Sequence, residues 1–145
     1  MKNFFISTLL TLSLSCFLLA AFVSPARSQP TTIALEGGSC SVKSLDLKPM
    51  WGPAGMKPDE KAFTVSFKCA LDKGFDKKAL GALYDKGSFK DATGKTYKPS
   101  AASINESELI YNLSVAVPQN VDVEALAFVF EKTTTSSLKV ETEKK

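Results

Sequence analysis

Two stretches of the chain alternate between apolar and polar side chains. In residues 61–71 (KAFTVSFKCAL), every second position from Phe63 to Cys69 is apolar and the positions between are polar. Residues 108–118 (ELIYNLSVAVP) alternate in a similar way and end at a proline. A period of two residues is typical of a β-strand with one face in the core and one in water. The pattern therefore predicts two half-buried strands, with Cys69 on the core face of the first.

Weaker segments extend this β pattern, with turn residues between them at a spacing of about ten residues. Together they predict about seven strands and an all-β antiparallel sandwich, with a small closed barrel as the alternative. The segments are a short edge strand at 32–35, a first long strand at 40–48 with a phase slip that predicts a bulge or a kink, and a hairpin at 89–97. They continue with a central strand at 121–131 that is apolar on both faces from 125 to 130, and a polar edge strand at 133–141.

One segment fits two structures equally well. In FDKKALGALYD (75–85), the apolar residues from Phe75 to Tyr84 recur near the 3.6-residue helical period, which predicts a short amphipathic helix. Gly81 lowers the helix propensity, and a strand through 81–84 is the alternative.

The N-terminus has the pattern of a secretory signal peptide. Lys2 precedes an apolar run from Phe4 to Val23, and small residues follow at Ala26 and Ser28. We expect cleavage after Ser28, or else after Ala26, which leaves one domain at 29–145 that is secreted or periplasmic. A retained anchor is the alternative, because the apolar run approaches the length that spans a bilayer. Lipidation of Cys16 is less well supported, since apolar sequence continues beyond it.

Removal of residues 1–28 leaves two cysteines, Cys40 and Cys69. An even number of cysteines in an exported chain predicts a disulfide between them. Closing a loop of this length stabilises a fold by roughly 3–4 kcal/mol.

The charge and composition exclude several functional classes. The domain at 29–145 has 16 basic and 15 acidic side chains, a net charge of +1, and no block of like charge. We therefore expect no nucleic acid as a partner, and no membrane contact once the signal peptide is removed. Histidine is absent from the chain, which removes Ser-His and Cys-His nucleophile pairs and the usual zinc sites. We expect no cofactor, no metal and no enzymatic activity.

The best candidate for a binding site is KPMWGPAGMKPDEKAF (48–63). It holds Trp51, the only tryptophan, with Met50 and Met56, among prolines and glycines that exclude a strand or helix. Restricted backbone lowers the entropy lost on binding, so these side chains would form a rigid apolar platform for a protein or glycan. Alternatively, Trp51 plugs the open end of the sandwich. Tyr97, beside a turn at Gly94, is a lesser candidate.

The order of these motifs resembles a known group of domains. The strand KAFTVSFK, the turn FKDATGKTYKP with its D-x-x-G-x-x-Y motif, and the strand EALAFVFE follow one another along residues 40–131. This order resembles the secreted immunoglobulin-like domains of bacterial lipoproteins and exported antigens, although the chain has no convincing lipobox. The resemblance implies an immunoglobulin-like β-sandwich outside the cytoplasm, and it assigns no functional residues.

These observations lead to two functional hypotheses. The first is an exported, non-enzymatic binding module that contacts a protein or glycan, with Trp51 at the centre of its site. The alternative is a structural or stress-related cell-envelope protein that joins other components through its sheet edges.

Overall fold

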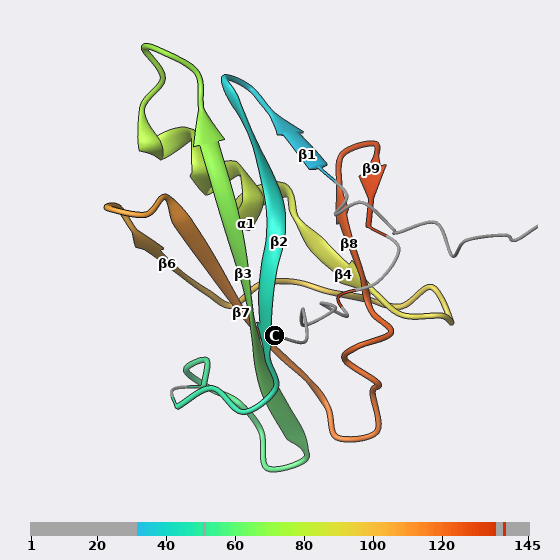
Figure 1. Cartoon of the computed structure of the whole chain (residues 1–145). Helices are drawn as coiled ribbons and strands as arrows, with labels where there is room; N and C mark the ends of the chain where they lie inside the picture. Colours follow the sequence, from blue (N-terminus) through green and yellow to red (C-terminus); the bar gives the residue numbers. More distant parts are fainter. Residues whose placement is uncertain (1–31, 51, 136–137, 139–145) are drawn as a thin grey trace, which may run out of the picture.

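The computed structural model describes residues 32–50, 52–135 and 138 of the chain. In this part, nine β-strands form two antiparallel sheets, joined on one side by a short helical segment (Figure 1). The all-β prediction is confirmed, with nine described strands where about seven were expected. The predicted signal peptide, Trp51 and most of the segment from 136 onward lie outside the described residues.

The larger sheet has five strands in the order β1-β2-β3-β7-β6, and each pairs antiparallel with its neighbours. The alternation predicted for β3 is confirmed, because Phe63, Val65 and Phe67 are fully buried. β2 shifts register against β3 between Val42 and Ser44, which confirms the predicted bulge. The bounds are β1 Thr32–Leu35, β2 Gly38–Asp46, β3 Glu60–Leu71, β7 Ile110–Pro118 and β6 Ala101–Asn105.

The smaller sheet has four strands in the order β5-β4-β8-β9. β8 is an inner strand, as expected, but it is shorter than predicted. Residues 121–126 form the connection from β7, in which Val123 and Leu126 are buried without being part of a strand. These apolar residues are therefore part of the hydrophobic core although they lie in a loop. The bounds are β5 Thr96–Tyr97, β4 Ser88–Lys90, β8 Ala127–Phe130 and β9 Thr133–Thr134.

The segment at 75–85, for which the sequence predicted either a helix or a strand, is helical. A 3-10 helix, η1 (Lys77–Gly81), leads directly into α1 (Ala82–Lys86). The side chain of Asp76 caps η1 by accepting a hydrogen bond from the backbone N–H of Lys78 at 3.1 Å. Leu80 and Leu83 are fully buried, so this segment covers one end of the core.

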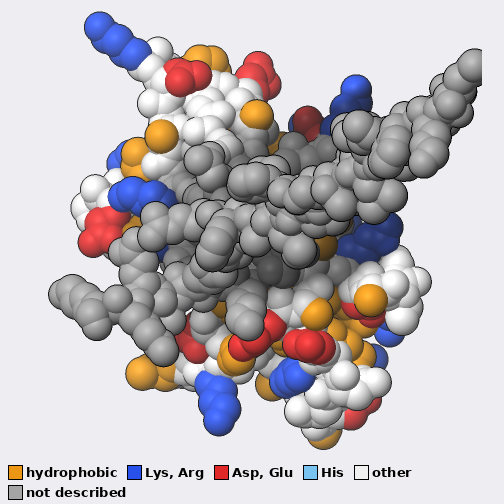
Figure 2. Space-filling model, turned by 45° about the vertical axis from the view of Figure 1, so that its right-hand side comes forward, with side chains coloured by type: hydrophobic (Ala, Val, Ile, Leu, Met, Phe, Trp, Pro, Cys, Tyr) orange, Lys and Arg blue, Asp and Glu red, His pale blue; other side chains and the backbone are white. Residues whose placement is uncertain are grey.

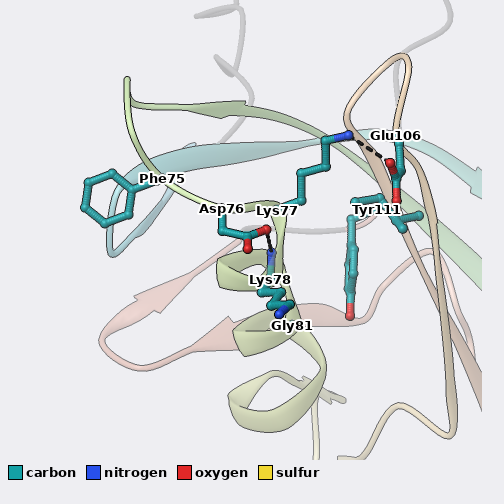
Figure 3. A pocket seen from close by; sticks show the side chains of 8 residues that line it. Phe75, Asp76, Lys77, Lys78, Gly81, Glu106 and Tyr111 are labelled. Carbon is teal, nitrogen blue, oxygen red and sulfur yellow. Dashed lines mark hydrogen bonds and ion pairs between the residues drawn. The ribbon is translucent and has the colours of Figure 1, made fainter.

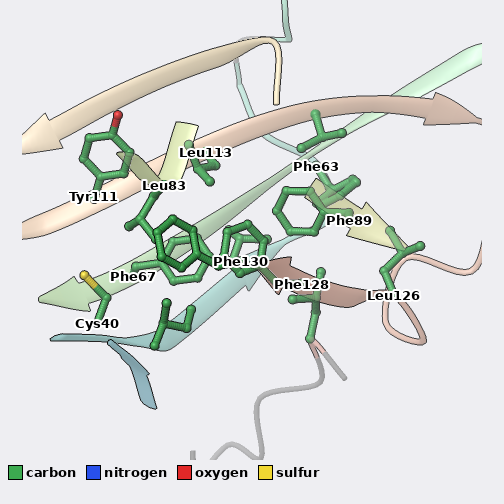
Figure 4. Packing of buried hydrophobic residues seen from close by; sticks show 14 of the residues in the cluster. Cys40, Phe63, Phe67, Leu83, Phe89, Tyr111, Leu113, Leu126, Phe128 and Phe130 are labelled. Atoms are coloured by element: carbon green, nitrogen blue, oxygen red, sulfur yellow. The ribbon is translucent and has the colours of Figure 1, made fainter. Parts of the chain in front are cut away.

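The two sheets pack face to face through aromatic side chains (Figure 4). Phe63 of β3 meets Phe89 of β4 with ring centroids 5.3 Å apart, in an edge-to-face arrangement. Phe67 of β3 meets Phe128 of β8 at 4.9 Å. Such pairs stabilise a core beyond the area that they bury. Because the two sheets remain separate, the fold is a sandwich and not a closed barrel.

The strand order is that of immunoglobulin-like sandwiches. Strands β2-β3-β7-β6 correspond to the order A-B-E-D, and β5-β4-β8-β9 to the opposite sheet with C, F and G and one added strand beside C. The disulfide between Cys40 and Cys69 is confirmed. It joins directly paired residues of β2 and β3 within one sheet, whereas antibody domains bridge their two sheets.

Candidate functional site

The predicted binding segment is the connection between β2 and β3, which we call the 47–59 loop. It lies at the end of β2 and β3 remote from the disulfide, the lower end in Figure 1. The backbone N–H of Lys57 donates to the Glu60 carboxylate at 2.9 Å, and the N–H of Glu60 donates to the Lys57 carbonyl at 3.1 Å. These bonds and the β2-β3 ladder hold the base of the loop, so the sulfur bridge is not what fixes it.

Apolar side chains of this loop face solvent. Met50 is 88% exposed, and Leu47 and Met56 are 44% and 42% exposed. By contrast, Pro53 is buried and anchors the middle of the loop. Trp51 lies outside the described residues, so the predicted site is supported here by its neighbours alone. Of the large hydrophobic residues that are exposed in the described part of the chain, the others are Phe75 and Tyr84, at the opposite end of β3.

The charges of the loop are separated into a basic tip and an acidic base. Lys48 and Lys57 are the ionisable residues between 47 and 58, and neither takes part in the ion pairs found among the described residues. At the base, the Asp46 carboxylate accepts the backbone N–H of Lys48 at 2.9 Å, much as Glu60 does for Lys57. The acids therefore stabilise the turn and leave the lysine ammonium groups in solvent.

The D-x-x-G-x-x-Y segment forms a closed turn unit in which Tyr97 is buried. One oxygen of Asp91 accepts from the backbone N–H groups of Thr93 (2.9 Å) and Lys95 (3.0 Å) and from the Thr93 hydroxyl (2.6 Å). The Tyr97 hydroxyl donates to the other oxygen at 3.0 Å. Gly94 has a φ of +89°, a conformation that side chains rarely adopt. The structure thus gives the motif residues a role in the turn itself.

The same contacts shift two pKa values in opposite directions. Hydrogen bonds from Thr93, and then Tyr97, lower the pKa of Asp91 against the opposing effect of partial desolvation. Desolvation, followed by the hydrogen bond to Asp91, raises the pKa of Tyr97. Lys95 places its ammonium 5.4 Å from the centre of the Tyr97 ring, so the ring is covered on this side as well.

A groove that the sequence did not reveal lies at the end of β3 opposite the loop. It has a volume of about 680 Å³ and lies between η1 and the β6-β7 hairpin, with Phe75, Ile104 and Tyr111 as apolar walls (Figure 3). The Lys77 ammonium lies 2.8 Å from the Glu106 carboxylate and connects the two walls. Burial, followed by the charges of nearby acidic and phenolic groups, raises the pKa of Tyr111. A second groove of similar volume lies on the other side of η1 and shares Phe75.

Residues far apart in sequence form this groove, which explains why the pattern of the chain did not predict it. The one local signal is Gly81 within a helical segment. A Cβ added there would meet no atom within 4 Å, so the glycine leaves the side of the groove open. Nothing in the sequence indicated that 75–81 would face the hairpin formed by β6 and β7.

Among the described residues, no three side chains of the His, Cys, Asp and Glu types come together as a metal site. Three acidic side chains have partners in the fold: Glu106 binds Lys77, Glu108 lies 3.7 Å from Lys43, and Glu60 accepts the backbone N–H of Lys57. No helix in the described ranges is long and apolar enough to cross a membrane.

Comparisons with known proteins add no relative. No family model, curated protein or solved structure matches this chain. The function is therefore argued from the geometry described above.

Proposed function

We propose that this chain is an exported, immunoglobulin-like binding module without enzymatic activity, and that the 47–59 loop contacts its partner outside the cytoplasm. The observation that carries the proposal is the exposure of Leu47, Met50 and Met56 on one loop. A side chain that stays in solvent gains nothing for the fold, whereas burying it against a partner is favourable by about 1.5–3 kcal/mol. Large exposed apolar patches are typical of interaction sites, and three large apolar side chains of one short loop are exposed here.

Three further properties of the loop support binding. Prolines at 49, 53 and 58 restrict its backbone, and Pro53 is buried. The hydrogen bonds between Lys57 and Glu60, one of them to the Glu60 carboxylate, close its base. A loop that is ordered before binding loses less entropy when a partner arrives. Trp51 belongs to the same stretch of sequence, and we expect Trp51→Ala to weaken binding.

Site-specific photocrosslinking in the native host tests this proposal. A photoreactive amino acid at Met50 is expected to give a covalent adduct with a macromolecule outside the cytoplasm. The matched control places the same amino acid at Ser66, whose side chain donates to Asn112 on the outer face of the larger sheet. If both positions give adducts alike, or if Ser66 alone gives them, the 47–59 loop is not the contact site.

A second candidate function, assembly through sheet edges, is favoured by one observation on β6. This edge strand has the sequence AASIN, with no charge and no proline, and its residues Ala102 and Ser103 are exposed. Edge strands are usually protected by charge, proline or a bulge. If β6 joins another strand, Ser103→Lys should convert an assembled form to monomer in sedimentation analysis. A wild-type chain that is monomeric at high concentration would exclude self-assembly by this route.

A further inference from the structure

Three apolar side chains of the 47–59 loop, Leu47, Met50 and Met56, are exposed at the surface of the protein. The two grooves described above are bordered by residues of 34–36, 75–86, 104–111 and 130–131, none of which belongs to the loop. Met50 is exposed over most of its surface. A partner of this loop therefore has to bury side chains that extend from the loop into the partner.

The charges at the tip of the loop favour an anionic partner. Lys48 and Lys57 stand on either side of Met50 and Met56, and no acid occurs between 47 and 58. Elsewhere on the described surface, basic and acidic side chains are interspersed, as on the face shown in Figure 2. The nearest acids are Asp46, Asp59 and Glu60 at the base of the loop. Asp46 and Glu60 accept backbone N–H groups there, and Asp59 is exposed. Between 47 and 58 the loop therefore carries two positive charges, and Asp59 adds one negative charge where the loop meets β3.

The position of the loop allows its tip to enter an interface while the sheets remain in water. It follows β2 and precedes the 12-residue strand β3, at one end of the sandwich (Figure 1). A strand of that length extends for about 40 Å, so the helical segment at its other end stays remote from anything that the tip contacts.

From these observations we infer that the 47–59 loop docks on the surface of a bilayer that contains anionic phospholipid. Met50, Leu47 and Met56 enter the boundary between headgroups and acyl chains, while Lys48 and Lys57 contact lipid phosphates. Apolar insertion combined with lysine attraction, worth about 1 kcal/mol per lysine near an anionic surface, is the usual basis of reversible interfacial binding. A fluid layer accommodates exposed apolar side chains without a preformed cavity, whereas a folded protein would need a matching surface for them.

This inference rests on the proposed function and names the partner of the same loop. It departs from the sequence-based expectation that the exported domain has no membrane contact. That expectation followed from the overall charge and from the loss of the N-terminal apolar run. It did not take account of the exposure of Met50, which is a property of the folded loop.

Vesicle binding of the exported protein tests the inference. The full chain is expressed in an exporting host, and intact mass identifies the N-terminus of the released form. That form is then mixed with vesicles of phosphatidylglycerol and phosphatidylcholine, or of phosphatidylcholine alone. Trp51 is the only tryptophan of the chain and lies in the loop, so its fluorescence reports on this segment. We expect a blue shift with the anionic vesicles, quenching by lipids brominated on their acyl chains, and weaker binding at high salt.

Two variants and one control assign the binding to named side chains. Met50→Ser with Met56→Ser is expected to weaken partition to anionic vesicles about 10- to 100-fold. Lys48→Glu with Lys57→Glu is expected to weaken it at least about 10-fold and to remove most of the salt dependence. Phe75→Ser, at the opposite end of β3, serves as the control and should bind as the wild type does.

The outcomes separate this inference from the proposed function. Absence of a tryptophan shift and of sedimentation with anionic vesicles would overturn the inference. If loop crosslinks in the host then lead to a protein or glycan, the proposed function stands with a different partner. Equal binding by the wild type and the methionine variant would also overturn the inference, because another surface would be responsible.

Discussion

The two ends of β3 carry the same kinds of side chain in different arrangements. At the helical end, Phe75 and Tyr84 are exposed, and Phe75 lines both grooves. Two lysines are paired there: Lys77 with Glu106 at 2.8 Å and Lys86 with Glu131 at 3.0 Å. At the loop end, methionines protrude and the lysines have no acidic partner among the described residues. Exposed apolar side chains therefore occur at both ends of β3, and the difference lies in the ion pairs, which are found at the helical end. At the loop end, the methionines and the two lysines remain available to a partner.

The disulfide belongs to the helical end, because Cys69 is two residues from the end of β3. The double variant Cys40→Ala, Cys69→Ala is therefore expected to loosen that end first and to lower the free energy of unfolding by about 3–4 kcal/mol. Urea denaturation measures the change. If hydrogen exchange in the variant increases in the 47–59 loop and not around β1 and η1, the assignment of the bridge to the helical end is wrong.

Leu83 attaches the helical segment to the core and is fully buried. Leu83→Ala should lower the free energy of unfolding by about 3 kcal/mol, since it removes buried methyl groups and leaves a cavity. Thermal and chemical denaturation check the value. Leu47→Ala, on the exposed loop, is the matched control, and a similar loss in that variant would contradict the contrast between the two ends.

The turn at Asp91 is expected to make stability depend on pH in the acid range. The folded-state pKa of Asp91 is lowered, chiefly by the Thr93 hydrogen bond, so its contribution is present above the unfolded pKa of about 4 and is lost as the pH falls through the folded value. Asp91→Asn should reduce stability at pH 7 and flatten the loss between pH 4 and pH 2. An unchanged acid profile would show that this carboxylate does not hold the turn.

Gly81 offers a stabilising change at the helical end. Its φ is −57°, and the space beside it is open. Gly81→Ala should therefore raise the free energy of unfolding by about 0.5–1 kcal/mol, because alanine restricts the unfolded chain and favours the helical backbone. Thermal denaturation measures the gain. A loss of stability would show that the groove closes around this position.

Met50→Ser is expected to have the smallest effect on folding. The side chain is almost fully exposed, so the free energy of unfolding should stay within about 0.5 kcal/mol of the wild type while partner binding falls. A loss of more than 1 kcal/mol in chemical denaturation would mean that Met50 packs against the protein and is not free for a partner.

The sequence predicted the larger sheet better than the smaller one. The strict alternation of β3 and the phase slip at Val42 are local signals, and the structure confirms both. β6 was missed because AASIN has little β-branched character and owes its strand to pairing with β7. The predicted central strand at 121–131 was too long, since apolar residues such as Leu126 enter the core from a loop.

The candidate site was predicted only in part. Proline and glycine spacing located the 47–59 loop, but the exposure of its methionines depends on how the loop leaves the sheet. The buried hydroxyl contact of Tyr97 depends on the turn closing around Asp91. The groove at η1 required the helical segment to meet Glu106, about thirty residues away in sequence, and no local pattern encodes that contact.

The central claim is that the loop end, and not the helical end, meets the partner. Methyl NMR of ¹³C-methionine tests it most directly, because Met50 and Met56 are the methionines of residues 29–145 and both lie in the loop. In the free protein, a soluble paramagnetic probe should broaden the Met50 methyl signal strongly and the Met56 signal less. Bound to the partner, both signals should become protected from the probe. Methyl groups that stay equally accessible in the bound state would contradict the account.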